Sequence, residues 1–393
     1  MQLYSLRILV WLLALALPDI AAASGADDTV DFDALIASLC QKRVVLLGED
    51  AGHGAGATVA VKGRIVEALV DRCGFDTLYF ESPLYEFLDL EERQARGDAQ
   101  PFHLADAIGP MWAGTREFEP TLHWLWQRSR TGALRLRGMD VQMGGISQHF
   151  SERELPARLA VHAGAERSAC EASLRRLTGW NFTESHPYDD AFRHGLRRCL
   201  SGIEQNLATS GDGPDRLSQR MAVSLGQFLD MSGDDDFNIR DAAMAQNILW
   251  HEDRAPGARA LVWTASSHAV KGSLPGYPHR VSLGMHLSAR FGDRLASIGF
   301  SARTGTHGRP SRPPVEIAPV AASLEQRRDV GAYVDSTALH RIGPVRSTAV
   351  TYGRPLLADW SLLLDGIWLL PAETPLHPRD ATEPASSGTH PSL

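Results

Sequence analysis

Lysine is scarce in this chain of 393 residues, which contains only Lys42, Lys62 and Lys271. The 39 lysine and arginine residues are outnumbered by 47 acidic residues, so the formal net charge is -8. Nucleic acids and anionic membranes are bound through clustered Lys and Arg, and no such cluster occurs here. The composition therefore argues against a nucleic-acid partner and against attachment to an anionic lipid surface.

The chain also lacks an apolar run long enough to span a membrane. The run Ile8–Leu17 has about ten residues, whereas a membrane helix needs roughly twenty. Ala21–Ala23 follow as the small residues of a cleavage site, and no cysteine follows the run to carry a lipid anchor. We therefore expect residues 1–23 to be a cleaved signal peptide and the mature protein to be periplasmic or secreted, with no stable membrane anchor. An uncleaved anchor is the alternative.

Cysteine is limited to four residues, an even number that favours disulfides in an exported chain. Cys40 and Cys73 each end a predicted helix just before a predicted strand, and Cys170 and Cys199 share a helical stretch. Of the three pairings that four cysteines allow, we predict Cys40–Cys73 and Cys170–Cys199. No CxxC or Cys/His metal spacing occurs, so a structural zinc site is not expected.

Several enzyme motifs are missing as well. The chain has no G-x-S-x-G nucleophile elbow, no HExxH, no Walker A loop and no G-x-G-x-x-G after a strand. These absences argue against a serine-triad hydrolase, a zinc protease, a P-loop nucleotidase and a dinucleotide-binding enzyme. We expect neither a metal nor another cofactor.

What the chain does contain is a strand–helix–strand unit. Val44–Leu47 is typical of a buried strand, Ala57–Asp71 has helical periodicity, and Thr77–Phe80 is typical of a second strand. Such a unit indicates an α/β fold with a mostly parallel central sheet flanked by helices.

The rest of the chain extends this pattern. Further strands are predicted at Leu134–Arg137, Ala260–Trp263 and Leu362–Leu370, and further helices at Asp31–Leu39 and Arg240–His251. Residues 150–237 are mostly helical and indicate a helical insertion or lobe. We therefore expect a catalytic core in two parts, 24–149 and 238–371, followed by a disordered tail at 372–393 that is rich in Pro, Ser and Thr.

Polar residues follow the ends of four predicted strands. Glu49 and His53 follow the first strand, Glu81 the second, Asp140 the third and His268 the fourth. Because ligands bind at the carboxyl edge of an open parallel sheet, we expect these side chains to converge there. Two carboxylates and two imidazoles in one place are able to activate water: a histidine takes the proton and a carboxylate fixes its tautomer.

Motifs around these residues resemble those of the erythromycin esterase family. Leu47–Thr58 is similar to its LGE-x-x-HG block, Gly74–Ser82 to its GFD…FES segment, and Gly138–Gln142 to its G-x-D-x-Q strand end. Three later blocks follow in the family's order, at Arg240–Asn247, Val262–His268 and Phe291–Gly292, with a weaker echo at Asp365–Ile367. The resemblance covers about residues 40–300.

The resemblance implies a role for each residue. His53 would be the general base on water, and Glu49, Glu81 and His268 would orient and polarise the reacting groups. The residues expected to contact substrate are Lys62, Asp140, Arg240 and Ser267.

One departure from the family pattern concerns the first block. Two residues usually separate the glutamate from the histidine, but Asp50, Ala51 and Gly52 stand between Glu49 and His53. The extra residue is either absorbed as a bulge in a glycine-containing turn or displaces the two side chains, which would slow the reaction.

The function predicted from the sequence is metal-independent hydrolysis of a small-molecule ester or lactone by an exported monomer. Macrolide-like lactones are suggested by the resemblance alone, because a fold does not fix a substrate. Two alternatives remain open: a metal-dependent hydrolase that uses the same His and Glu residues, and a non-catalytic relative that binds a small molecule.

Overall fold

The computed structural model describes residues 25–143, 149–208, 214–231, 235–310 and 312–379. The predicted signal peptide, residues 1–23, lies outside this part of the chain, as does most of the predicted tail.

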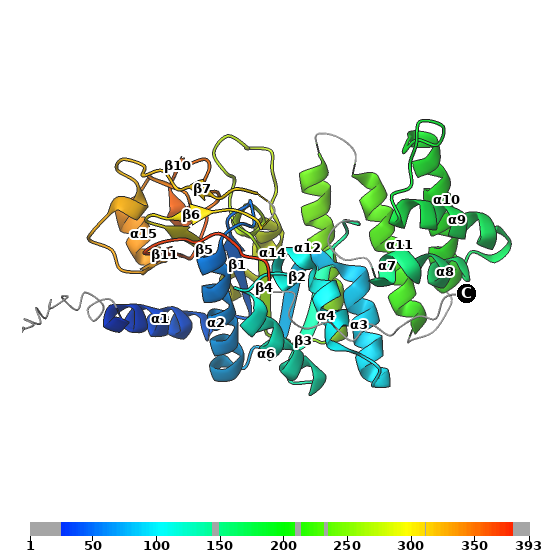
Figure 1. Ribbon diagram of the computed structural model, residues 1–393, viewed down its shortest axis with the longest axis horizontal. Coiled ribbons are helices and arrows are strands. Elements are labelled where there is room, and N and C mark those ends of the chain that lie inside the picture. The colour runs from blue at the N-terminus through cyan, green and yellow to red at the C-terminus, as the bar shows by residue number, and fades with distance from the viewer. Residues whose placement is uncertain (1–24, 144–148, 209–213, 232–234, 311, 380–393) are drawn as a thin grey trace, which may run out of the picture.

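A seven-stranded sheet runs through the centre of the molecule, with the strand order β3-β2-β4-β1-β5-β11-β8 (Figure 1). Each neighbouring pair is parallel, except that β8 runs antiparallel to β11. The predicted mostly parallel α/β sheet is thus confirmed. The strands of this sheet are β1 (Val44–Glu49), β2 (Thr77–Pro83), β3 (Arg135–Asp140), β4 (Ala260–Ala265), β5 (Leu295–Ala302), β8 (Tyr333–Asp335) and β11 (Gly366–Leu370).

Both faces of the sheet are covered, which is why its strands are apolar along their whole length. In β1, Val45 and Leu47 pack into one hydrophobic cluster, whereas Val44 and Leu46 pack into another on the opposite face. The first face is covered by α1 (Gly25–Leu39), α2 (Gly56–Cys73), α4 (Pro101–Ile108), α5 (Pro110–Ala113) and α6 (Glu119–Arg130). The second is covered by α12 (Asp236–Arg254) and α14 (Leu283–Phe291).

The helices between β3 and α12 build a lobe at one end of the molecule, shown in green at the right of Figure 1. They bury a hydrophobic cluster of their own, to which α3 (Leu84–Arg96) contributes Leu84, Tyr85 and Leu88. The lobe consists of α7 (His149–Arg153), α8 (Leu155–Ala160), α9 (Arg167–Thr178), α10 (Asp190–Ala208) and α11 (Pro214–Asp230).

Short elements occupy the other end of the molecule, where Figure 1 shows them in yellow and orange. They form two small antiparallel sheets, β6 with β7 and β9 with β10. Their bounds are β6 (Thr306–His307), β7 (Val315–Glu316), α15 (Ser336–Ile342), β9 (Val345–Ser347) and β10 (Leu356–Ala358).

Three sequence predictions about elements need correction. Strand β5, the central partner of β1, was not predicted, and the last strand begins at Gly366 instead of Leu362. Residues 372–379 are ordered against the core, because the Glu373 carboxylate accepts hydrogen bonds from the Ala57 and Thr58 amides at the first turn of α2. A carboxylate is favourable at this position since it meets the positive end of the helix dipole.

Both predicted disulfides are confirmed. Cys40–Cys73 joins the end of α1 to the end of α2, and Cys170–Cys199 joins α9 to α10. The first bond therefore lies at the edge of the sheet where the parallel strands begin, and the second links two helices of the lobe.

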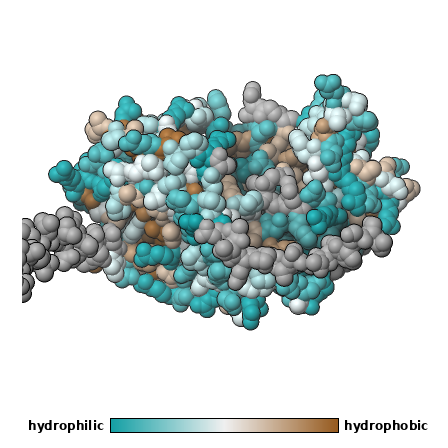
Figure 2. Space-filling model, viewed as in Figure 1, coloured by the Kyte–Doolittle hydropathy of each residue, from teal (hydrophilic) through white to brown (hydrophobic). Residues whose placement is uncertain are grey.

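The exposed face in Figure 2 is mostly hydrophilic, and its hydrophobic residues form small separate patches. Among the described residues, no helix combines the length and the apolar composition needed to cross a membrane.

Candidate active site

A cleft of about 610 Å³ lies at the carboxyl edge of the sheet, where β1, β2 and β4 end. This is the edge at which open parallel sheets bind ligands. Three of the four predicted catalytic residues, His53, Glu81 and His268, line it. The other lining residues are Ala51, Pro110, Met111, Gln142, Arg240, Ala265, Ser267, Arg309 and Pro310.

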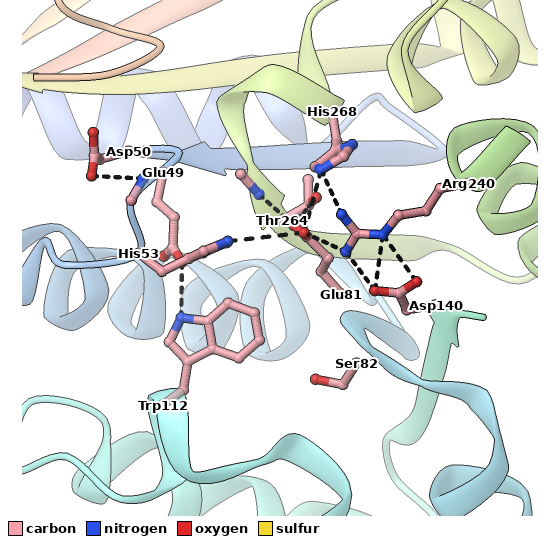
Figure 3. A network of polar contacts seen from close by, with 12 residues as sticks. Glu49, Asp50, His53, Glu81, Ser82, Trp112, Asp140, Arg240, Thr264 and His268 are labelled. Atoms are coloured by element: carbon pink, nitrogen blue, oxygen red, sulfur yellow. Dashed lines mark hydrogen bonds and ion pairs between the residues drawn. The ribbon is translucent and has the colours of Figure 1, made fainter. Parts of the chain in front are cut away.

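Glu49, the last residue of β1, is fully buried behind His53. Its Oε1 lies 2.8 Å from His53 Nδ1 and accepts a hydrogen bond of 2.8 Å from Trp112 Nε1 (Figure 3). Its Oε2 accepts a hydrogen bond of 3.0 Å from Lys62 Nζ. Burial alone would raise the pKa of Glu49, but Lys62 and His53 outweigh burial and lower it. The carboxylate is therefore ionised, and its orientation is fixed by three donors.

His53 is held with one ring nitrogen committed and the other directed at the cleft. Because an ionised carboxylate only accepts hydrogen bonds, the proton of the neutral ring resides on Nδ1, facing Glu49. Nε2 is then unprotonated and lies 3.9 Å from Glu81 Oε1. This is the tautomer that a general base requires.

The loop that carries His53, which contains the extra residue, has an unusual backbone conformation. His53 has a φ of 52°, in the left-handed region that residues other than glycine seldom adopt. Asp50 stabilises the turn: its Oδ2 accepts a hydrogen bond of 2.9 Å from the Gly52 amide, and its Oδ1 accepts one of 2.9 Å from the Tyr352 amide. The His53–Glu49 contact is therefore made despite the longer loop.

Glu81, near the carboxyl end of β2, lies at the centre of the polar network in Figure 3. Its Oε2 accepts hydrogen bonds from Thr264 Oγ1 (2.7 Å) and the Ala265 amide (2.8 Å). Its Oε1 lies 2.9 Å from Arg240 Nη2 and 3.3 Å from His268 Nε2. Burial would raise its pKa, but His268 and Arg240 hold the pKa well below the ordinary value. Glu81 is consequently an anion that positions two cations.

His268 follows β4 in the short helix α13 (Ser266–Ala269) and faces a carboxylate on each side. Its Nδ1 lies 2.7 Å from Asp241 Oδ1, and the ring of Phe237 stacks on it at a centroid distance of 5.1 Å. Burial would lower its pKa, but Glu81 and Asp241 raise the pKa to about 10. The two carboxylates thus favour the protonated ring over a neutral base, although Arg240 Nη1 also lies 3.3 Å from Nε2.

Arg240, on α12, connects Glu81 with Asp140. Its Nη2 lies 2.5 Å from Asp140 Oδ2, and its Nε donates to Asp140 Oδ1 at 3.1 Å. Asp140 is fully buried and is not among the residues that line the cleft. Asp140 was predicted to contact substrate, but the Arg240 guanidinium lies between Asp140 and the cleft. Asp140 therefore orients Arg240 from behind.

Lys62 also differs from its predicted role. Its side chain is fully buried, lies over the ring of Trp263 at 4.2 Å, and donates to Glu49 and to the Thr264 carbonyl. Burial lowers its pKa to about 8, although Glu49 and Glu81 act in the opposite direction. Lys62 therefore contacts Glu49 from behind and does not face the cleft.

Some site residues were missed by sequence reasoning. Trp112 and Asp241 are not among the predicted site residues, because their contacts with Glu49 and His268 are made between separate parts of the chain. Arg309 and Met111 also line the cleft, and no sequence pattern marks them.

Within the described part of the chain, no three His, Cys, Asp or Glu side chains are arranged to hold a metal ion. The carboxylates of Glu49 and Glu81 already form ion pairs with Lys62 and Arg240. The donor set therefore suits a buried ion-pair network better than a divalent cation.

The sequence model of the erythromycin esterase family matches residues 70–330. This range contains Glu81, Asp140, Arg240 and His268 and begins after Glu49 and His53. A Bacillus subtilis (strain 168) protein named "Putative hydrolase YbfO" is 21% identical over 334 aligned residues, which cover 72% of this chain and 71% of that protein.

Two solved structures show the same fold. A succinoglycan biosynthesis protein matches with a TM-score of 0.70 and 15% identity, over 88% of this chain and 92% of the other. A mutant of the erythromycin esterase EreC in its open conformation matches with a TM-score of 0.62 and 16% identity, over 87% of this chain and 93% of the other.

Proposed function

This chain belongs to the erythromycin esterase family, and from that premise we propose that it is an exported enzyme that cleaves an ester or lactone with water activated by His53. Family membership and the name of the curated relative indicate a hydrolase. The ester or lactone bond as the point of cleavage, and His53 as the base, are what we propose beyond hydrolysis.

The reaction begins when His53 Nε2 takes a proton from water. The resulting hydroxide attacks the carbonyl carbon of the substrate, and the imidazolium formed at His53 lies between two carboxylates, Glu49 at 2.8 Å and Glu81 at 3.9 Å. Both anions stabilise the charge that His53 acquires in the transition state. Collapse of the tetrahedral intermediate returns the proton to the leaving alkoxide, so the products are a carboxylic acid and an alcohol.

Negative charge develops on the carbonyl oxygen during the attack, and two cations line the same cleft. His268 and Arg240 are each fixed by a buried aspartate, Asp241 and Asp140. Donors held in place before the reaction stabilise an oxyanion without reorganising. We propose that Arg240 binds the oxyanion through its remaining N–H groups. His268 contributes its positive charge, because both of its ring nitrogens already contact carboxylates.

The observation that carries the proposal is the His53–Glu49 contact at the wall of the cleft. A histidine whose Nδ1 is held by an ionised carboxylate, and whose Nε2 faces a cleft, has the arrangement of a general base. A structural histidine gains nothing from a left-handed backbone that directs its ring into a cleft, and such strain is common at functional sites.

The test is turnover of a panel of esters and lactones, including a macrolide, by the mature protein with and without a chelator. His53→Ala is the variant, and His340→Ala, which removes an exposed histidine on α15, is the matched control. We expect wild-type turnover to survive chelation, to persist in His340→Ala, and to fall by about a hundredfold or more in His53→Ala.

Each other outcome favours one alternative. Loss of turnover on chelation would replace the proposal with a metal-dependent hydrolase. Binding of panel compounds without any turnover would replace it with a non-catalytic binding protein.

A further inference from the structure

The charges deepest in the cleft are paired with one another. Glu81 contacts both Arg240 and His268, and behind these cations lie Asp140 and Asp241. Two cations and three carboxylates thereby form one buried network. Its charges are paired with one another, and its two cations are assigned to the oxyanion of the reaction. Recognition of the substrate depends on lining groups that this network leaves free.

Arg309 is such a group, and it is the cation at the cleft that forms no ion pair with any described residue. Its Nε donates a hydrogen bond of 2.8 Å to the Gly52 carbonyl, next to His53. The side chain is exposed and lines the cleft, so the two Nη groups are free to meet a ligand.

The backbone beside Arg309 is fixed to the same loop that carries His53. The Gly308 amide donates to the Gly54 carbonyl at 2.8 Å, and the Leu376 amide donates to the Gly308 carbonyl at 2.9 Å. The backbone of Arg309 thus has a fixed position relative to His53. A fixed distance between the two residues allows Arg309 to recognise a substrate group that lies near the reacting bond.

The remaining polar groups of the lining are neutral. The side chains of Ser267 and Gln142 line the cleft and form no hydrogen bond within the described residues. They suit a hydroxyl or carbonyl of the substrate, whereas a free guanidinium suits an oxyanion, which it binds through two parallel hydrogen bonds.

We infer that the substrate is an ester that bears a carboxylate, which Arg309 binds while His53 directs water at the ester bond. The inference rests on the proposed function, because it places the carboxylate relative to the bond that His53 would hydrolyse. It also predicts discrimination: a substrate with a cationic group at the same place meets Arg309 with like charge and is disfavoured.

Three esters of 4-nitrophenol that differ in terminal charge test this inference. The hydrogen adipate is anionic, the hexanoate is neutral, and the 6-aminohexanoate is cationic. We expect wild type to prefer the adipate, and Arg309→Gln to lower kcat/KM for the adipate by about ten- to a hundredfold. The loss for the hexanoate, which reports what the broken contact with the Gly52 carbonyl costs any ester, should be smaller than the loss for the adipate. The ratio of kcat/KM for the 6-aminohexanoate to that for the hexanoate should rise.

Arg312→Gln is the matched control, since it removes an exposed arginine from the same segment without touching the cleft. It should leave the order of the three esters unchanged. Equal loss for all three esters in Arg309→Gln, or a wild type that prefers the neutral ester, would overturn the inference while leaving ester hydrolysis intact.

Binding of compounds that cannot be hydrolysed as esters separates this inference from the proposed function. Calorimetry should show that adipic acid monoamide binds wild type more tightly than hexanamide does, and that Arg309→Gln removes the difference. If no ester is turned over but this preference is found, the hydrolytic mechanism fails and the acid-binding role of Arg309 stands. If the preference is absent, the inference fails regardless of turnover.

Discussion

At the scale of single residues, the conformation of His53 is the feature that most needs an explanation. A left-handed backbone costs a residue with a β-carbon about 1–2 kcal/mol, so other contacts must hold it in place. Asp50 provides them, because one carboxylate oxygen receives the Gly52 amide and the other receives the Tyr352 amide. The structure thereby joins the His53 loop to the C-terminal part of the chain.

Asp50→Ala should therefore misplace His53 without removing any group that reacts. We expect kcat to fall by about ten- to a hundredfold, because a small displacement of a catalytic group has an effect of this order. KM should change little, since the free polar groups of the cleft remain. Steady-state kinetics measures kcat and KM of both proteins. The control is Asp50→Asn, because the asparagine side chain retains the Oδ1 acceptor. A kcat of Asp50→Ala equal to wild type would show that Asp50 does not position His53.

His268 predicts a dependence of stability on pH. Its pKa in the folded protein is about 10, above its ordinary value of 6.5, so its contribution is fully present below pH 6.5 and is lost as the pH rises through 10. Lys62 acts in the opposite direction, because its pKa is lowered from 10.5 to about 8 and folding is favoured as the pH rises between these values. Comparison of wild type with His268→Gln removes the effect of Lys62, which both proteins share.

The expected result is a difference in the free energy of unfolding that is largest below pH 6.5 and shrinks toward pH 10. Urea denaturation across this range measures it. A difference that grows with pH would mean that His268 is neutral in the folded protein and that its role as a cationic donor is wrong.

The positions of His53, Glu81 and His268 could be predicted from the sequence, because each lies near or just after the carboxyl end of a buried strand that is recognisable from its apolar residues. The roles of Asp140 and Lys62 were not predictable, because which atoms face the cleft depends on Arg240 and Glu49, which stand in front of them. Arg309 was not predictable either: it reaches the cleft through contacts with a loop more than 250 positions earlier in the chain.

At the scale of elements, the site is a product of parallel strand order. Strands β2, β4 and β1 are adjacent in the sheet, so their carboxyl ends bring Glu81, His268 and Glu49 together. The sequence predicted these strands because they are rich in Val, Leu and aromatic residues. Strand β5 was missed because it contains Ser297, Gly299 and Ser301, whose burial is made favourable by hydrogen bonds to distant residues and by close packing on Leu364.

The Cys40–Cys73 disulfide joins two helices just before β1 and β2 begin, at the sheet edge opposite the cleft. It closes a loop with a sequence separation of 33, for which the chain-entropy model gives a stabilisation of about 3–4 kcal/mol. The double variant Cys40→Ser, Cys73→Ser should lose about 2–4 kcal/mol of unfolding free energy, and its kcat at a temperature where it remains folded should match wild type. Urea denaturation and kinetics on the same sample measure both.

A loss of kcat without a loss of stability would contradict the view that this disulfide stabilises the fold without affecting the cleft at the opposite edge of the sheet. The double variant Cys170→Ser, Cys199→Ser provides a control for the removal of two cysteines, because that bond joins helices of the lobe.

At the scale of the whole molecule, the cleft is assembled from parts that are far apart in sequence. Its lining extends from Ala51 to Pro310 and includes Met111 on α5 and Gln142, which follows β3. A fold with this connectivity could be predicted in outline, as a parallel sheet with a helical insertion. The side chains that complete the cleft could not, because they depend on how segments far apart in the sequence, such as α5 and the Arg309 segment, pack at the carboxyl edge of the sheet.

Export remains a prediction, since residues 1–23 lie outside the described residues. We expect the protein recovered from the periplasm or medium of an expressing bacterium to begin near Ser24 and to contain no free thiol. Intact mass spectrometry, before and after reduction and alkylation, checks both points. The mass of the full-length chain in this fraction, or free thiols without reduction, would contradict the prediction.

The most direct test of the central claim is chemical rescue of His53→Ala. Removing the imidazole leaves room at a residue that lines the cleft, so added imidazole is able to take its place as the base on water. The account predicts that His53→Ala loses turnover and that imidazole restores part of it with saturation, whereas imidazole leaves the turnover of wild type and of the His340→Ala control unchanged. Wild-type turnover in His53→Ala without imidazole would contradict the claim that His53 activates water.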